Sequence, residues 1–139
     1  MDEITFHART HRPGTILDVG AHDGLLTIPL ARLPGTRVLA FEPLPSAYAR
    51  LAAACAGLAN VELRREALGA APGRLMLSVP VVDGVPAEQW ASLAKDYGAF
   101  ASVTTETHAV EVITIDSLSL SDVTHMKVDA EGFEQEVLE

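Results

Sequence analysis

The chain has 139 residues, of which 48% are hydrophobic and 21% charged, with 10 glycines and 8 prolines. These values describe one folded domain and exclude a disordered, collagen-like or low-complexity chain. The formal net charge is −9 and the 10 basic residues are spread thinly, which argues against nucleic acid and anionic membranes as partners. No apolar run approaches the roughly 20 residues that span a bilayer, and acids follow the first methionine where a secretory signal has bases. We therefore expect a cytoplasmic protein.

The first half of the chain alternates short apolar runs with segments of helical character. Residues 15–19 and 37–41 are nearly all apolar, which is the pattern of strands buried on both faces of a parallel sheet. A helix is predicted after each run, over residues 25–33 and 46–56, because a proline–glycine pair or a glycine follows each segment. This half therefore predicts a β-α-β-α unit.

The second half continues around an insertion. Residues 61–65 alternate polar and apolar side chains, which is typical of an outer strand of a parallel sheet. Residues 74–79 and 110–115 predict a pair of strands, and residues 80–109 are interpreted as an insertion into a single domain, 1–139. The insertion is either packing structure or a lid on the acceptor side of the site.

Inside the insertion, Pro86 is a candidate start for a short helix. One face of that helix carries Trp90, Leu93, Ala94 and Tyr97. The aromatic side chains, with Phe100, are expected to pack in the core and the insertion, and a lid over the acceptor is the alternative.

The chain ends on a predicted strand, residues 125–129, and a predicted helix, residues 130–139. The alternation of strands and helices predicts an α/β fold with a doubly wound, mostly parallel sheet and helices on both faces. Sheets of this kind bind their ligands in the crevice at the carboxyl ends of the strands, so the functional residues are sought there.

The loop after the first predicted strand contains an acid and two glycines, Asp18, Gly20 and Gly24. Glycine is needed where the backbone turns sharply and approaches a ligand closely, so the pattern indicates a nucleotide-type loop. The loop lacks the G-x-G-x-x-G spacing of dinucleotide enzymes, because His22 and Leu25 stand where the second and third glycines belong. A cofactor with a pyrophosphate is therefore a poor match.

Acids follow the ends of the other predicted strands. Glu42 ends the second strand, where a carboxylate can accept hydrogen bonds from both hydroxyls of an adenosine ribose. A ribose without a pyrophosphate points to S-adenosylmethionine. Glu66 and Ala67 follow the third strand, where an acid can bind the adenine amino group. Asp129 ends the last strand and is expected to face the same crevice, with Glu131 beside it at a helix N-terminus.

With these residues the chain resembles the FkbM-type S-adenosylmethionine-dependent O-methyltransferases, within the Rossmann-like class I methyltransferases. The matching segments cover most of residues 14–139 and are DVGAHDG (18–24), AFEP (40–43), EALG (66–69), TIDSL (114–118) and MKVDAEGFEQEVL (126–138). The last segment, coming after TIDSL, is the most specific to this family. The resemblance implies methyl transfer to a hydroxyl of a small molecule or sugar.

The resemblance also implies a role for each candidate on the cofactor side. Asp18 and Gly20 would meet the methionine end of S-adenosylmethionine, Glu42 its ribose, and Glu66 its adenine edge. These roles agree with the positions of the four residues at the ends of predicted strands.

On the acceptor side, Asp129 and Glu131 would face the transferable methyl group. Methyl transfer needs an oxygen nucleophile in line with the S–CH3 bond, and alignment supplies most of the barrier reduction. A base assists because a protonated hydroxyl is a weak nucleophile, and Asp129, Glu131 and His125 are the candidates for it. The carboxylates would also stabilise a cationic cofactor, and a surface or packing role is the alternative for His125.

Other residues keep alternatives open. His22 belongs with Gly24 to the cofactor-binding set, and it is expected to hydrogen-bond within the loop rather than to catalyse. No ligand spacing supports a metal site from Asp129, Glu131 and a histidine, so no metal is expected. Lys127 is expected to pair with a neighbouring acid.

Family members continue with further strands that complete the sheet, so the resemblance implies a partial domain, truncated at its C-terminus. The last strand would then be an open edge that favours self-association. Two rival functions remain: an inactive or truncated S-adenosylmethionine-binding module, and a nicotinamide-dependent oxidoreductase, which the glycine spacing disfavours. The residues do not select among acceptors.

Overall fold

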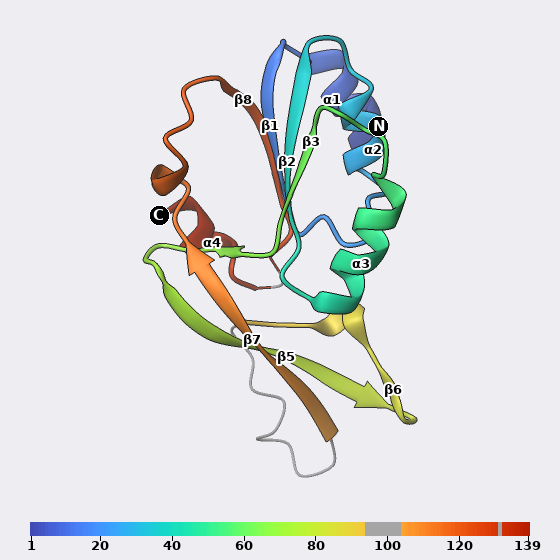
Figure 1. The fold of residues 1–139 in the computed structure, drawn as a ribbon, viewed down its shortest axis with the longest axis vertical. Coiled ribbons are helices and arrows are strands. Elements are labelled where there is room, and N and C mark those ends of the chain that lie inside the picture. The colour runs from blue at the N-terminus through green and yellow to red at the C-terminus, as the bar shows by residue number, and fades with distance from the viewer. Residues whose placement is uncertain (94–103, 131) are drawn as a thin grey trace.

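Two four-stranded sheets organise the chain in the computed structural model, which describes residues 1–93, 104–130 and 132–139 (Figure 1). Sheet A has the strand order β3-β2-β1-β8 and is parallel throughout. Its strands are β1 (Gly14–Val19), β2 (Thr36–Phe41), β3 (Val61–Arg64) and β8 (Val123–Val128). The sequence pattern predicts each of these strands, and β3 lies at an edge of the sheet, as its alternation indicates.

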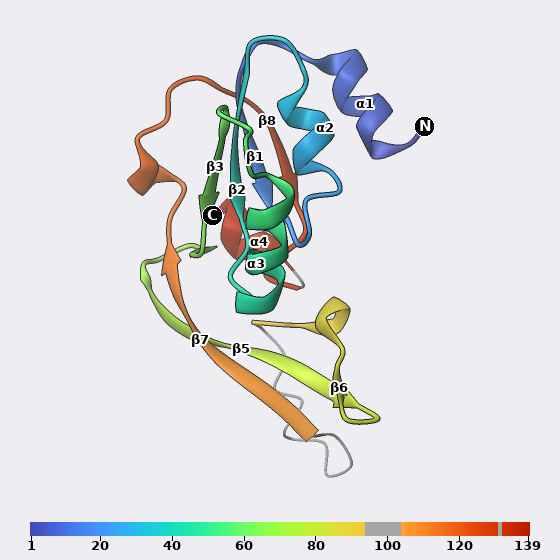
Figure 2. The same ribbon diagram turned by 45° about the vertical axis from the view of Figure 1, so that its right-hand side comes forward.

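One face of sheet A is covered by the predicted helices α2 (Thr27–Ala31) and α3 (Pro45–Ala54) (Figure 2). Ile16 of β1 and Val38 of β2 belong to one core cluster with residues of both helices. In α2, Pro29 is tolerated because it lies in the first turn, where the backbone N–H groups have no helical partner.

The other face of sheet A is covered by α4 (Glu134–Leu138) and by the segment after sheet B that includes the short 3₁₀ helix η3 (Asp116–Leu118). Leu17 of β1 and Phe41 of β2 pack there with Val137 of α4. Side chains alternate between the faces of a strand, so a strand buried on both faces must be apolar throughout. The parallel sheet covered on both faces confirms the predicted doubly wound α/β fold.

Sheet B lies across the carboxyl ends of the strands of sheet A (Figure 1). Its order is β4-β7-β5-β6, and its strands are β4 (Ala67–Leu68), β5 (Gly73–Val82), β6 (Val85–Pro86) and β7 (Thr104–Ile113). The predicted pair of strands, 74–79 and 110–115, is present as β5 and β7, which pair antiparallel. They form a sheet of their own instead of extending the parallel one.

The apolar face of sheet B packs against the start of α3. Leu77 and Val79 of β5 belong to one core cluster with Val110 of β7, and with Leu44 and Ala47 at the N-terminal end of the helix. This cluster joins sheet B to sheet A, so a cavity between the two sheets has walls from both.

The first helix, α1 (Glu3–Thr10), was not predicted from the sequence. Asp2 caps it, because its side chain accepts a hydrogen bond from the backbone N–H of Thr5 at 2.7 Å. His7 is the buried residue of α1, and its ring packs edge-on against the ring of His125 in β8, with 5.8 Å between ring centres.

The insertion differs in part from the expectation. The helix expected from Pro86 is a single 3₁₀ turn, η1 (Glu88–Trp90). Trp90 is 54% exposed and therefore does not pack in the core. Ala94, Tyr97 and Phe100 lie outside the described residues.

Strand β8 is the open edge that the sequence predicts. Within the described residues it pairs on one side only, with β1, and its outer side has no partner strand. Self-association through this edge stays a prediction. Among the helices of the described ranges, none is long and apolar enough to cross a membrane.

Candidate functional site

A cavity of about 260 Å³ opens at the carboxyl ends of the sheet A strands, where they meet sheet B. Its wall includes these predicted site residues: Gly20, His22, Glu42, Glu66, Ala67 and Asp129. The cavity lies at the place that doubly wound sheets use for ligands. The structure therefore brings together most of the residues that the sequence singles out.

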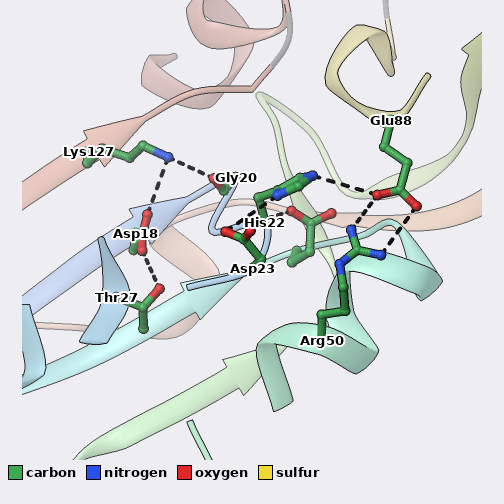
Figure 3. A network of polar contacts seen from close by, with 9 residues as sticks. Asp18, Gly20, His22, Asp23, Thr27, Arg50, Glu88 and Lys127 are labelled. Atoms are coloured by element: carbon green, nitrogen blue, oxygen red, sulfur yellow. Dashed lines mark hydrogen bonds and ion pairs between the residues drawn. The ribbon is translucent and has the colours of Figure 1, made fainter. Parts of the chain in front are cut away.

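Asp18 does not line the cavity but lies beneath the glycine loop. Its side chain is fully buried, and its Oδ2 accepts a hydrogen bond from Thr27 Oγ1 of α2 at 2.5 Å. Lys127 Nζ lies 3.5 Å from Asp18 Oδ1 and donates a hydrogen bond to the carbonyl oxygen of Gly20 at 2.7 Å (Figure 3). Asp18 thus holds the loop through Lys127 and Thr27, and Lys127 has the acidic partner that the sequence predicts.

A prediction follows for the hydrogen bond between Thr27 and Asp18. Replacing Thr27 by valine keeps the shape but removes the donor to a buried carboxylate, so we expect the free energy of unfolding to fall by about 2 kcal/mol. Urea denaturation measures this loss.

Thr36→Val is the matched control, because Thr36 is also buried but its Oγ1 has no hydrogen-bond partner. We expect this variant to be as stable as the wild type or slightly more stable. Equal losses in the two variants would show that the hydroxyl of Thr27 contributes nothing specific.

The glycine loop approaches the end of β8 so closely that a side chain cannot fit. Gly20 has φ +76°, and a Cβ built on it would lie 1.9 Å from the carbonyl oxygen of Asp129. Gly24 has φ +88° and packs toward Leu51 and Cys55 of α3 and its C-cap, away from the cavity lining. Gly20 therefore shapes the cavity directly, whereas Gly24 supports the turn.

Glu42 places a buried carboxylate in the cavity wall. The residue is 6% exposed, and its two oxygens accept hydrogen bonds from the backbone N–H groups of His22 at 2.8 Å and Leu44 at 2.9 Å. Burial raises the pKa of Glu42, and the two backbone hydrogen bonds oppose this shift in part. Each carboxylate oxygen keeps a lone pair with which a ligand hydroxyl can bond.

Glu66 lines the same cavity beside Ala67. Its Oε1 accepts a hydrogen bond from Arg64 Nη2 at 2.9 Å. Burial alone would raise the pKa of Glu66, but the hydrogen bonds from Arg64 and from the backbone outweigh it and lower the pKa. Glu66 is therefore an ionised hydrogen-bond acceptor at neutral pH.

Asp129 lines the cavity beyond the end of β8, next to Ala130. Its backbone N–H donates to the carbonyl oxygen of Val19 at 2.9 Å, which continues the pairing between β8 and β1. The position agrees with the expected direction of Asp129 into the crevice. Glu131 lies outside the described residues.

His125 does not line the cavity, so the structure gives no support to its expected role as a catalytic base. The residue lies near the start of β8, where its Nε2 is 3.0 Å from the carbonyl oxygen of Thr10 and its ring stacks on that of His11. A base must reach the proton it removes, and the contacts of His125 are with α1 and the residue after it. The packing role that the sequence left open is the one the structure supports.

The contact between His7 and His125 predicts a pH dependence of stability. Burial lowers the pKa of His7 from 6.5, and the nearby His125 lowers it further, whereas Glu3 and Asp18 act in the opposite direction. A histidine whose pKa is lower in the folded state contributes stability above its unfolded pKa, and this contribution is lost as the pH falls toward the folded pKa. We expect the unfolding temperature to fall between about pH 7.5 and pH 5.5, and to fall less in His7→Leu. A fall of the same size in both chains would refute the assignment, and His108→Gln on β7 is the control.

The sequence did not single out four residues that sheet B, η1 and the residue after it contribute to the cavity: Leu77, Glu88, Gln89 and Ala91. It named Leu93, a fifth lining residue, only as part of a helix face. What the sequence offered for those within residues 80–109 was the interpretation of this insertion as a lid on the acceptor side of the site. No motif marks Glu88, because its place in the wall depends on how sheet B packs on sheet A.

The charges of the cavity wall are one-sided. Four carboxylates line it, Glu42, Glu66, Glu88 and Asp129, and no lysine or arginine is among the described lining residues. Among the described residues, no group of three or more histidine, cysteine or acidic side chains is placed to hold a metal ion. The wall therefore suits a ligand that offers hydrogen-bond donors or a positive charge.

A solved FkbM methyltransferase structure shares this fold. The FkbM methyltransferase from Methylobacillus flagellatus matches with a TM-score of 0.56 and 16% identity, over 98% of this chain and 35% of its own. A protein assigned as an rRNA-methylase, from Clostridium thermocellum, matches with a TM-score of 0.42 and 21% identity, over 46% of this chain and 39% of its own, and supports no argument. The chain thus spans well under half the length of either structure. No curated protein has a significant match.

The fold and the cavity at its strand ends define a doubly wound α/β domain of the kind that binds a ligand at the ends of its strands. The family model of the methyltransferase FkbM domain matches residues 18–139, which is most of the chain. The chain therefore belongs to the FkbM methyltransferase family, as the sequence motifs predict.

Proposed function

We propose that this chain forms the donor site of an S-adenosylmethionine-dependent methyltransferase that transfers the methyl group to a hydroxyl oxygen. The observation that carries the proposal is the acid-lined cavity at the carboxyl ends of sheet A, with the buried Glu42 at the end of β2. A carboxylate at this position suits the two hydroxyls of a ribose.

The charge of the cavity favours a sulfonium cofactor over a dinucleotide. A nicotinamide dinucleotide brings a pyrophosphate with two negative charges, and no basic side chain among the described lining residues would neutralise them. S-adenosylmethionine has no phosphate and carries a positive charge on sulfur. The residues present therefore fit S-adenosylmethionine.

Each donor-side residue has its own role in binding the cofactor. Gly20 lets the loop backbone come close to the ligand, Glu42 accepts hydrogen bonds from the ribose hydroxyls, and the ionised Glu66 accepts one from the adenine amino group. His22 shapes this site by donating its backbone N–H to Glu42. When bound, S-adenosylmethionine supplies an electrophilic methyl group.

On the acceptor side, Asp129 is the described residue that can take a proton. It lines the cavity at the end of β8, where its backbone lies close to Gly20, and its carboxylate would accept the proton of the attacking hydroxyl. The acceptor proposed is a hydroxyl of a small molecule or sugar, as the family resemblance implies.

Calorimetric titration of the purified chain with S-adenosylhomocysteine tests the proposal, with NAD as the competing ligand. We expect a micromolar dissociation constant for S-adenosylhomocysteine, about −8 kcal/mol at 1 μM, and binding of NAD that is at least about a hundredfold weaker. A folded chain that binds NAD more tightly, or that binds neither ligand, would overturn the proposal. Circular dichroism on the same sample establishes that the chain is folded.

A further inference from the structure

The wall of the cavity opposite sheet A belongs to sheet B. The short helix η1 is fixed to this sheet by backbone hydrogen bonds, from Ala87 N–H to the carbonyl oxygen of Pro80 at 2.8 Å, and between Ser78 and Ser92 in both directions at 2.9 Å. The backbone around Glu88, the first residue of η1, is therefore attached to sheet B.

The carboxylate of Glu88 contacts two elements that belong to sheet A and its helices, namely α3 and the glycine loop. Its Oε1 accepts a hydrogen bond from Ser46 Oγ of α3 at 2.7 Å, and its two oxygens face the guanidinium of Arg50, also on α3. Its Oε2 lies 3.7 Å from His22 Nε2 in the glycine loop. Figure 3 shows the imidazole ring of His22 and the guanidinium group of Arg50 pointing toward this one carboxylate.

The contacts of Glu88 differ from those of the surface ion pairs. The Arg50 and Glu88 side chains are 47% and 22% exposed, whereas Arg74 and Glu111, paired on sheet B, are 70% and 58% exposed. A partly buried pair in which a planar guanidinium meets both carboxylate oxygens is stronger than an exposed pair, which water and salt weaken. The Arg50 side chain lowers the pKa of Glu88, so the carboxylate stays ionised at neutral pH.

His22 connects the Glu88 contacts to the residue proposed to bind the ribose. The backbone of His22 has φ 51°, a left-handed conformation that is uncommon for a residue other than glycine. Its backbone N–H donates to Glu42 Oε2 at 2.8 Å, while its ring lies between Asp23 and Glu88. Glu88 and Glu42 thus contact the same residue, His22, one through its ring and the other through its backbone N–H.

We propose that Glu88 is a positioning residue of the donor site. Its contacts with Arg50 of α3 and His22 of the glycine loop, which we call the clasp, hold η1 in place and so keep the cavity closed over a bound ligand. The proposal rests on the proposed function, because the ligand is taken to be the adenosyl cofactor. The ligand then dissociates only after the clasp opens, so Glu88 and Arg50 set the residence time of the ligand.

Binding kinetics of S-adenosylhomocysteine test the role of the clasp in four chains: wild type, Glu88→Gln, Arg50→Met and the double variant. We expect each single variant to raise the dissociation rate constant by about tenfold and to leave the association rate constant within about twofold. The double variant is expected to match Glu88→Gln, because the ion pair between Glu88 and Arg50 is already lost in that single variant. Arg50 does not line the cavity, and its side chain hydrogen-bonds to Glu88, so we expect its effect on the ligand to act mainly through Glu88.

Arg74→Ala is the control, because it removes an exposed ion pair on the same sheet, and its dissociation rate is expected to equal that of the wild type. Hydrogen exchange of residues 86–93 without ligand gives an independent readout, and we expect it to be faster in Glu88→Gln. A wild-type rate in the Arg50 variant, or additive effects in the double variant, would overturn the clasp. Wild-type chain that binds no S-adenosylhomocysteine overturns the proposed function and this role together, whereas normal binding with unchanged rates in both variants overturns this role alone.

Discussion

Replacing Glu42 by alanine is expected to weaken the binding of S-adenosylhomocysteine by about a hundredfold. Two hydrogen bonds from ribose hydroxyls to a buried carboxylate are worth about 3 kcal/mol together, which corresponds to that factor. Calorimetric titration of both chains under the same conditions gives the ratio of the dissociation constants.

The carboxylate also accepts hydrogen bonds from His22 and Leu44, so the alanine variant leaves two backbone N–H groups unpaired. Glu42→Gln, which preserves the volume, is the second variant, and thermal unfolding of both variants separates a loosened loop from a lost ligand contact. Glu111→Ala, an exposed glutamate on β7, is the control and is expected to bind as the wild type does. Binding of wild-type strength in a stable Glu42 variant would remove Glu42 from the site.

The raised pKa of Glu42 predicts two opposite pH effects. Burial raises this pKa above the ordinary value of 4.5, so the carboxyl binds its proton more tightly in the folded than in the unfolded chain. As the pH falls through the folded pKa, this group alone makes the unliganded chain more stable, while ligand binding weakens because the ionised acceptor is lost. Both effects are expected to disappear in Glu42→Gln, in unfolding curves and titrations recorded across the acidic range.

The second large effect is expected for Gly20→Ala, which should lower the free energy of unfolding by about 3 kcal/mol or more. The added Cβ would lie 1.9 Å from the carbonyl oxygen of Asp129, a backbone atom that cannot turn aside, and φ +76° is itself strained for alanine. To accommodate the methyl group, the glycine loop must move away from the end of β8. Urea denaturation measures the loss of stability.

Gly57→Ala separates the two causes. Gly57 has φ +86°, close to that of Gly20, but a Cβ there meets no atom within 4 Å. We expect this control to cost only the backbone strain, about 1 kcal/mol. Equal losses at the two positions would mean that the close approach of the loop to Asp129 is unimportant.

Sheet A could be predicted from the sequence because its strands carry a local signal. The runs at residues 15–19 and 37–41 are nearly all apolar on both faces, and this pattern needs no knowledge of the partner strands. The acids Glu42, Glu66 and Asp129 come just after β2, β3 and β8, so the topology alone places them at one end of the sheet.

Sheet B and its contribution to the cavity could not be predicted in the same way. Strands β5 and β7 were recognised, but the place where a pair of antiparallel strands packs depends on the side chains of α3 that it meets. The helix α1 was missed because only His7 of its residues is buried, so it has no apolar stripe. His125 was assigned to the site although it precedes Asp129 by four residues, about 13 Å along an extended strand.

The neighbours of β1 in sheet A come from opposite ends of the chain. Strand β2 follows it closely, but β8 supplies its other neighbour, and Lys127 meets the glycine loop 107 residues after Gly20. The unit of β1, β2 and β3 with α2 and α3 can form from contacts that are short in sequence, whereas the loop closes only when β8 arrives. Long-range pairing is slow to form. During synthesis, the buried Asp18 can therefore pair with Lys127 only after residues 1–127 have been made. We expect the donor site to be the last part of the sheet to fold.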